Sequence, residues 1–215
     1  LENLNNSKKP FIIYKSNKGF DLYTDFSKKI ILTKNNIKKF INHSTKLKFK
    51  KKETDLFIGF FGYEILNNLI GVKVKKQKGL KFPKGIFYKP ETKQKLPSRL
   101  DYKKLEIIKS NTLFNININR ASYKIIFDRF KKKIKSGETY QIKICTKYSN
   151  KTQIDALDFF CRLVKSNMAP EAFMIKDKDY SIISCSPENL INKKNDFITT
   201  KPIAGTLKKT KKLNK

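Results

Sequence analysis

The clearest hydrophobic pattern in the chain lies between residues 119 and 137. Apolar residues recur there at spacings of three and four, which places them on one face of a helix. They are Tyr123, Ile126, Phe127, Phe130 and Ile134. Asn119 offers a side-chain acceptor to the first turn, and Gly137 suits the position just after a helix. The pattern predicts an amphipathic helix whose apolar stripe packs in a core.

Alternation of apolar and polar residues predicts a strand directly after this helix. In residues 139–149, Tyr140, Ile142, Ile144 and Tyr148 share one face. Gln141 lies on the other face, which borders either a cleft or solvent. Further strands are predicted at 11–14, 29–32, 56–61, 112–119, 172–175 and 181–185.

Shorter helical patterns alternate with these strands. One helix follows Thr33 with Ile37 and Phe40 on its apolar face, and another opens at Thr152. A third, over residues 63–70, is expected to turn Leu66, Leu69 and Ile70 inward. Together the elements predict the α+β class, with antiparallel sheets flanked by helices.

Two strand–turn segments near the end of the chain carry candidate chemistry. Pro187 cannot continue a strand ladder, so the backbone turns there and presents Glu188. In the second segment Pro202 closes a strand, and Gly205 permits close approach of a ligand. A carboxylic acid facing a Lys–Gly–Thr loop suits an anionic substrate. Two ordinary hairpin turns are the alternative interpretation.

The composition adds a strong positive charge, +31 from 49 Lys and Arg against 18 Asp and Glu. Such a charge is typical of nucleic-acid-binding proteins. Nearly all of it is Lys, spread along the chain, whereas Arg reads phosphates and bases better. No helix-turn-helix, zinc-finger or RNP1 pattern occurs. We therefore expect no nucleic-acid partner, and keep a basic nucleic-acid-binding protein as the non-enzymatic alternative.

The three cysteines and single histidine restrict the chemistry further. Cys145, Cys161 and Cys185 are widely spaced and form no CxxC pair, so a Cys/His zinc site is not predicted. No apolar run reaches the ~20 residues of a membrane span. Residues 1–6 do not resemble a signal peptide. These features predict a cytoplasmic protein with reduced thiols and no membrane partner.

Three blocks, in this order, resemble the chorismate-binding enzymes. They are SGETYQI at residues 136–142, SCSPENL at 184–190 and TTKPIAGT at 199–206. The family includes anthranilate synthase component I, aminodeoxychorismate synthase component I, isochorismate synthase and salicylate synthase. The resemblance covers residues 118–215, and more weakly residues 56–92. It implies an anthranilate synthase component I-like fold.

The resemblance also implies roles for individual residues. Glu188 matches the family's S-P-E glutamate, the general acid that protonates the departing hydroxyl of chorismate. Substrate-binding positions are implied at Gln141, Lys201, Ala204, Gly205 and Thr206. Family members usually carry Arg where Lys201 stands, and Lys keeps the charge without the bidentate fork.

Two of these positions favour one branch of the family. Isochorismate and salicylate synthases carry a Lys base where Gln141 stands, so Gln141 favours a branch that uses ammonia. Many aminodeoxychorismate synthases carry a nucleophilic Lys where Ala204 stands. The resemblance thus favours anthranilate synthase, which makes anthranilate and pyruvate for tryptophan biosynthesis. Aminodeoxychorismate synthase, which serves folate biosynthesis, remains the alternative.

The resemblance implies a cofactor and a partner as well. The family uses Mg2+, whose glutamate ligands are expected beyond residue 215, so no metal ligand is predicted within the chain. Ammonia is expected from a glutamine amidotransferase subunit. We expect residues 1–110 to be a partial N-terminal region and residues 111–215 the truncated first part of the catalytic domain. A chain incomplete at its C-terminus is expected to be inactive by itself.

Overall fold

The computed structural model of the 215-residue chain describes residues 1–6, 8–16, 19–46, 53–72, 82–102, 113–151, 154–203 and 205. The chain divides into two compact units. The first joins residues 1–103 to residues 156–215, and the second consists of residues 104–155. The domain boundary predicted near residue 110 lies outside the described residues. A division into 1–110 and 111–215 stays a prediction.

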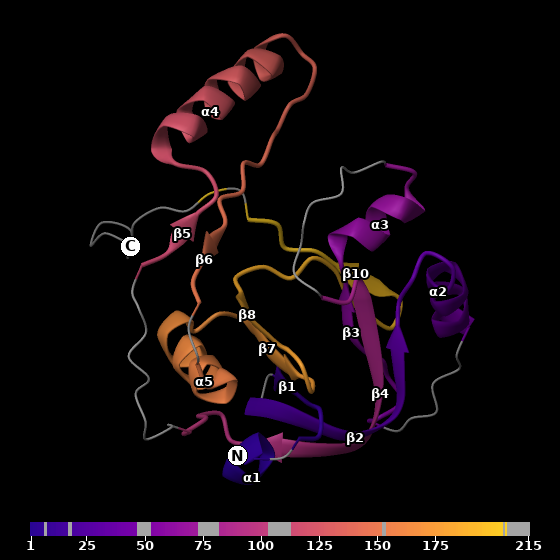
Figure 1. Cartoon of the computed structure of the whole chain (residues 1–215). Helices are drawn as coiled ribbons and strands as arrows, with labels where there is room; N and C mark the ends of the chain where they lie inside the picture. Colours follow the sequence, from indigo (N-terminus) through magenta and orange to yellow (C-terminus); the bar gives the residue numbers. More distant parts are fainter. Residues whose placement is uncertain are drawn as a thin grey trace, which may run out of the picture. The chain divides into compact units, whose positions relative to one another are not determined.

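The first unit is built on a six-stranded sheet in which every strand pair is antiparallel (Figure 1). In chain order the strands are β1 (Phe11–Ser16), β2 (Gly19–Ile31), β3 (Ile58–Phe61), β4 (Gly85–Leu96), β7 (Glu171–Lys176) and β8 (Ser181–Ser186). Their spatial order is β3-β4-β2-β1-β7-β8, so strands from both sides of residue 110 share one sheet. The antiparallel sheet with its helices agrees with the predicted α+β class.

A helix covers one face of this sheet. Successive residues of β1 point to opposite faces, so Phe11 and Ile13 enter a different hydrophobic cluster from Ile12. The helix α5 (Ala156–Asn167) packs on the Phe11 face and buries Leu157, Phe160 and Cys161. The rings of Phe160 and Phe20 meet edge to face, with centroids 6.1 Å apart. Burying a large apolar side chain contributes roughly 1.5–3 kcal/mol, which anchors α5.

Three shorter helices lie in the described ranges of the first unit. The short helix α1 (Glu2–Asn6) contributes Leu4 to the cluster on which α5 packs, and Leu1, just before the helix, packs there too. The helices α2 (Ile37–Lys46) and α3 (Tyr63–Leu69) form a separate cluster with the end of β2. Its buried members are Leu32, Ile37, Phe40 and Ile65. The predicted burial of Ile37 and Phe40 is therefore confirmed.

The inward-facing residues predicted for α3 need correction. Ile65 is fully buried, whereas Ile70 is 72% exposed. The helix ends at Leu69, and Gly71 follows with a φ of 75°, so Ile70 no longer follows the helical face. Leu69 packs partly against the cluster, and the side chain of Leu66 lies outside the described residues.

A buried carboxylate ties the β7–β8 turn to the rest of the sheet. Asp177 is 7% exposed, and its Oδ2 lies 2.6 Å from the Nζ of Lys29 on β2. The hydroxyl of Tyr88 on β4 donates to the same oxygen, and the Lys178 N–H donates to Oδ1 at 2.7 Å. Burial alone would raise the pKa of Asp177, but the hydrogen bonds from Lys29 and Tyr88 outweigh it and hold the pKa below its usual value.

The second unit contains the helix α4 (Arg120–Lys135) and two short strands, β5 (Asn115–Ile116) and β6 (Tyr148–Ser149). Both predicted helix signals are confirmed. The Asn119 side chain accepts from the Ser122 N–H at 2.8 Å, as an N-cap does. At the other end, Gly137 has a φ of 76°, and the N–H groups of Gly137 and Glu138 donate to Ile134 and Lys133 in a Schellman motif.

The predicted burial of the α4 stripe is wrong for the described residues. Tyr123, Phe127 and Ile134 are 41%, 45% and 40% exposed, and no residue of α4 is buried. The periodicity placed these residues on one face correctly. Within residues 113–151, however, the second unit offers no layer against which that face is buried.

The two strands predicted beside α4 are shorter than the alternation suggested. Among the described residues, ladder pairing here is confined to β5 and β6, two residues each, whereas strands were predicted over 112–119 and 139–149. A strand needs a partner for its backbone groups, and residues 139–147 pair with no strand among the described residues. The predicted alternation of buried and exposed side chains is confirmed in part, because Ile142 and Ile144 are half-buried while Gln141 is exposed.

Candidate active site

The turn that carries Glu188 follows the last strand of the six-stranded sheet. The strand β8 ends at Ser186, and Pro187 then takes the chain out of the ladder, as predicted. The Ser186 hydroxyl donates to the carbonyl oxygen of Glu188 at 2.9 Å and accepts from its N–H at 3.4 Å. One serine therefore holds the backbone of the turn from within. The Glu188 side chain is exposed.

A second set of contacts fixes the far side of the same turn. The Nδ2 of Asn189 donates to Oε1 of Glu171 at 3.0 Å, and the Tyr14 hydroxyl donates to Oε2 at 2.6 Å. Glu171 and Tyr14 were not predicted as site residues. Asn189 belongs to the SCSPENL block, but nothing in the sequence indicates its partner. In the sequence Glu171 is only a polar residue next to a predicted strand.

The second motif lies beyond a small hairpin. The strands β9 (Asn192–Lys194) and β10 (Phe197–Thr199) pair antiparallel and are exposed throughout. Lys201 and Gly205 follow and are also exposed, whereas Ala204 and Thr206 lie outside the described residues. Within the described part of the chain, no hydrogen bond or ion pair joins Lys201 to Glu188. The contact of Lys201 with substrate stays a prediction.

Gln141 belongs to the second unit, whereas Glu188, Lys201 and Gly205 belong to the first. Its side chain is exposed, and the backbone there is not part of a strand ladder. The prediction that Gln141 and Glu188 face one substrate therefore remains a prediction.

The described residues contain no group of three or more His, Cys, Asp or Glu that could hold a metal ion. Mg2+ prefers octahedral coordination by carboxylate oxygens and water, and a single exposed Glu188 does not provide that set. The residues described here therefore do not fit a magnesium site. None of the helices in the described ranges has the length and apolar character required to cross a membrane.

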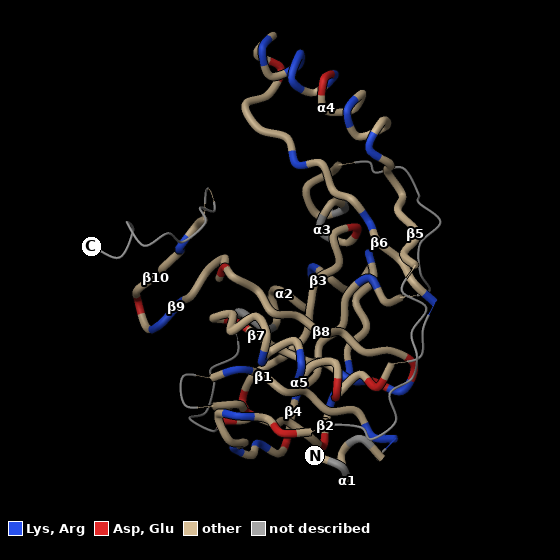
Figure 2. The backbone as a smooth tube through the Cα atoms, turned by 90° about the vertical axis from the view of Figure 1, so that its left-hand side faces the viewer, with Lys and Arg blue, Asp and Glu red and all other residues tan. Residues whose placement is uncertain are grey.

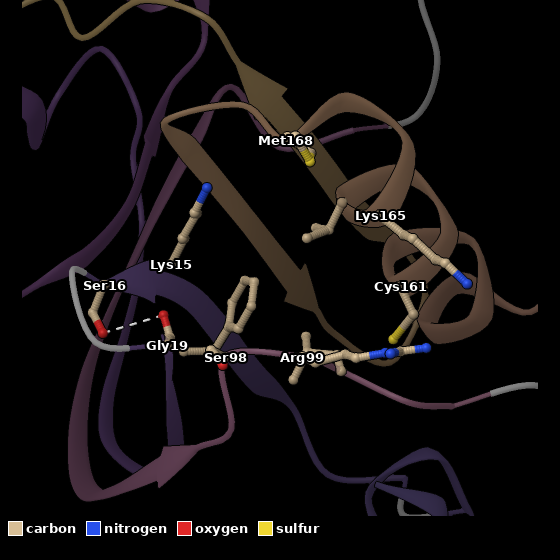
Figure 3. A pocket seen from close by; sticks show the side chains of 11 residues that line it. Lys15, Ser16, Gly19, Ser98, Arg99, Cys161, Lys165 and Met168 are labelled. Atoms are coloured by element: carbon tan, nitrogen blue, oxygen red, sulfur yellow. Dashed lines mark hydrogen bonds between the residues drawn. The ribbon is translucent and has the colours of Figure 1, made fainter.

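A pocket of about 540 Å3 lies elsewhere in the first unit, beside the β1–β2 hairpin and the end of α5 (Figure 3). Lys15, Arg99 and Lys165 line it together with apolar side chains, and its lining includes no carboxylate. Two of these cations already have partners. Lys15 donates to the Ala169 carbonyl, and the Nε of Arg99 lies 3.2 Å from Asp101. None of the predicted site residues that the structure describes lines this pocket, so it is distinct from the Glu188 turn.

The basic residues do not gather on one element. Figure 2 shows Lys and Arg on strands, helices and loops along the described chain. The helix α4 carries many of them, including Lys132, Lys133 and Lys135 in its last turn. Their positive charges interact favourably there with the negative end of the helix dipole. This distribution resembles a compositional bias more than a single binding stripe.

Comparison with known proteins places this sequence in a family. A sequence model described as chorismate binding enzyme matches residues 4–215, which is nearly the whole chain. The chain belongs to the chorismate-binding enzyme family. The resemblance drawn from the three sequence blocks is thereby confirmed. In this family member Glu188 is the second residue after the end of β8, at the end of the S-P-E motif.

Curated relatives of this family member include proteins named aminodeoxychorismate synthase component 1 and anthranilate synthase component 1. Aminodeoxychorismate synthase component 1 of Salmonella typhimurium is 30% identical over 120 residues, which cover 56% of this chain and 25% of that protein. Anthranilate synthase component 1 of Archaeoglobus fulgidus is 24% identical over 165 residues, covering 72% of this chain and 40% of that protein. Anthranilate synthase component 1 of Buchnera aphidicola is 32% identical over 118 residues, covering 54% and 23%. The matched part thus spans about a quarter to two fifths of these relatives.

Proposed function

We propose that the full-length protein containing this chain is the synthase subunit of an enzyme that aminates chorismate. Ammonia would replace the allylic hydroxyl of chorismate, and loss of pyruvate would then give anthranilate. The family match over residues 4–215 carries the proposal. It is supported by relatives named anthranilate synthase component 1 and aminodeoxychorismate synthase component 1.

Glu188 is proposed as the general acid. The hydroxyl leaves as water only if it receives a proton, and a carboxylic acid can deliver one when desolvation raises its pKa towards neutrality. The position of Glu188, projecting from a turn held by Ser186, supports this role. Its side chain is exposed in the described residues, so bound substrate would have to exclude the water around it.

Gln141 supports ammonia over water as the nucleophile. An amide side chain is no base near neutral pH, so it cannot activate water for the isochorismate reaction. The exposed position of Gln141 leaves its amide able to donate and accept hydrogen bonds to a ligand. We propose that it binds substrate or orients ammonia.

Aminodeoxychorismate synthase is the second candidate. It is favoured by the 30% identity to the Salmonella typhimurium relative. Against it stands Ala204, whose methyl group cannot act as the nucleophile that many such enzymes carry there. The two candidates share the substrate and the proton donor, and they differ in the carbon that receives the amine.

A glutamine amidotransferase subunit is proposed as the source of ammonia, and Mg2+ as the cofactor of the full-length protein. The residues that would hold Mg2+ are not among those described in this chain, and the metal would supply positive charge to an anionic substrate. Lys201 and the backbone of Gly205 would bind a carboxylate of that substrate. A cytoplasmic location is proposed with them, since Cys145, Cys161 and Cys185 are free thiols, as expected in a reducing compartment.

Replacing Glu188 tests the proposal. In the full-length protein, Glu188→Gln keeps the size and a hydrogen-bond donor but cannot deliver a proton. We expect kcat to fall ~100-fold or more while KM changes little. Chorismate turnover with ammonia is measured by product chromatography, which also separates anthranilate from aminodeoxychorismate. A kcat within threefold of the parent would remove Glu188 from the mechanism.

A second substitution tests the choice of nucleophile. Gln141→Lys places a base where the amide stands, so the full-length variant should form some isochorismate from chorismate and water. Gln141→Met, of similar size without a base, is the matched control and should form none. If neither variant yields isochorismate while both stay folded, Gln141 does not decide between ammonia and water.

A further inference from the structure

Glu171 links the Glu188 turn to β1 through the two oxygens of its carboxylate. Oε1 accepts from the Nδ2 of Asn189 at 3.0 Å, and Oε2 accepts from the hydroxyl of Tyr14 at 2.6 Å. A carboxylate that accepts one hydrogen bond on each oxygen is fixed in rotation as well as position. Glu171 therefore forms a bridge between β1 and the residue that follows Glu188.

The strand register explains why Glu171 occupies this place. It is the first residue of β7 and pairs with Ser186, the last residue of β8. On its other side β7 pairs with β1, where Tyr14 is opposite Phe173. Ser186 thus holds the turn on the N-terminal side of Glu188, and Glu171 holds it on the C-terminal side through Asn189.

We propose that Glu171 is a positioning residue for Glu188, acting through Asn189 and itself oriented by Tyr14. The proposal rests on the proposed function of Glu188 as the proton donor. General acid catalysis requires the acid within hydrogen-bond reach of the departing oxygen, and a displacement of about 1 Å can cost ~100-fold in rate. An exposed turn holds a side chain in so precise a position only when hydrogen bonds from other side chains restrict the conformation of its backbone.

The state of Tyr14 is consistent with this arrangement. Burial, followed by the hydrogen bond to Glu171, raises the pKa of Tyr14. The tyrosine therefore keeps its proton and remains a donor to Glu171 throughout the physiological range. Its strand, β1, lies inside the six-stranded sheet, which gives the bridge a rigid base.

The first experiment measures the order of the turn and does not depend on activity. Backbone 15N order parameters are recorded for Glu188, Asn189 and Leu190 in the 215-residue chain. We expect values near those of a rigid backbone, about 0.85, to fall below about 0.6 in Glu171→Ala. Glu171→Gln should restore them, because its amide oxygen accepts from Asn189 and its NH2 donates to Tyr14.

Two further variants keep this measurement decisive. Asn189→Ala removes the other end of the same hydrogen bond and should loosen the turn as much as Glu171→Ala does. Glu91→Ala, at an exposed glutamate on β4, is the matched control and should change nothing. Order parameters that stay unchanged in both Glu171→Ala and Asn189→Ala would overturn the proposal.

The second experiment measures kinetics in the full-length protein. Glu171→Ala should lower kcat about 10-fold with KM within twofold, and Glu171→Gln should remain within threefold of the parent. The double variant with Asn189→Ala should be no slower than Glu171→Ala, because both remove one interaction. A loosened turn with an unchanged kcat would overturn the catalytic part. A parent protein that does not aminate chorismate would overturn the proposed function, while the order parameters would still decide whether Glu171 holds the turn.

Discussion

The two longest helices that the structure describes, α4 and α5, have opposite environments. The helix α5 lies beside the six-stranded sheet (Figure 1). Its residues Leu157, Phe160 and Cys161 are buried against that sheet. In α4 the apolar stripe is as regular, yet no residue of that helix is buried among the described residues. The helix α4 has hydrogen-bonded caps at both ends, whereas α5 is stabilised by its packing on the sheet.

This contrast separates two kinds of information in a sequence. Periodicity and capping residues are local, and they specify where a helix begins, where it ends and which side is apolar. Burial is not local, because it depends on the layer that faces the stripe. For α5 that layer is β1, β2 and β7 in the same unit, and for α4 the described residues supply none.

The largest expected effect comes from truncating the packed stripe. Phe160→Ala should reduce the free energy of unfolding by about 3–5 kcal/mol, since it removes a fully buried ring that contacts Phe20. Phe127→Ala in α4 is the matched control, because its ring is 45% exposed, and it should cost less than about 1 kcal/mol. Urea unfolding of the 215-residue chain measures both. Equal losses would mean that the α4 stripe is packed as tightly as the α5 stripe.

The next effect concerns the charged groups of the two units. Asp177→Asn should reduce the free energy of unfolding by about 2 kcal/mol at neutral pH, because Lys29 and Tyr88 lose a buried charged acceptor. In the second unit, Glu138 pairs with Lys133 at the surface. Glu138→Gln should leave the urea midpoint unchanged within error. A large change in the Glu138 variant would contradict the view that only the sheet depends on its ion pairs.

The same aspartate predicts a dependence on pH. Since the pKa of Asp177 is held below its ordinary value in the folded chain, its stabilisation is complete above the ordinary value of about 4. It is lost as the pH falls through the folded pKa. Urea unfolding between pH 6 and pH 2 should therefore show a shallower decline in Asp177→Asn than in the parent. An identical slope in both would exclude Asp177 from the acid sensitivity.

The smallest effect tests the capping of α4. Asn119→Ala removes the acceptor for the Ser122 N–H and should cost about 1 kcal/mol of helix stability. Asn119→Asp keeps an acceptor at the same place and should restore it. Thermal melting followed by far-UV circular dichroism measures the change. If Asn119→Ala melts like the parent, contacts other than the cap stabilise the helix.

The parts of the fold that the sequence predicts well are those set by local chemistry. Asn119 and Gly137 marked the ends of α4 to within a residue, and Pro187 marked the end of β8. The strand predicted over residues 139–149 failed because a ladder needs a partner that alternation does not reveal. Ile70 failed because the helix stopped one residue earlier.

In the candidate site, too, local features could be predicted from the sequence and tertiary contacts could not. Glu188 was recognisable from its block, since Pro187 and the motif are contiguous. Its support by Glu171 and Tyr14 was not, because Glu171 meets Asn189 and Tyr14 only through the register of three strands. A tertiary hydrogen bond between residues so far apart leaves no periodic signal in one sequence.

The strand order has a consequence for synthesis. β1 is an inner strand. It pairs with β2 directly, but its other partner, β7, comes after the whole second unit, so the ladder between Ile12 and Ile175 forms only later. At ribosomal rates of about 5–20 residues per second, the delay is roughly ten to thirty seconds. During that time one side of β1 is an open apolar edge available to other nascent chains. Slower translation of the Lys-rich segments between the two strands would lengthen this exposure, and chaperone capture of the emerging N-terminal half would shorten it.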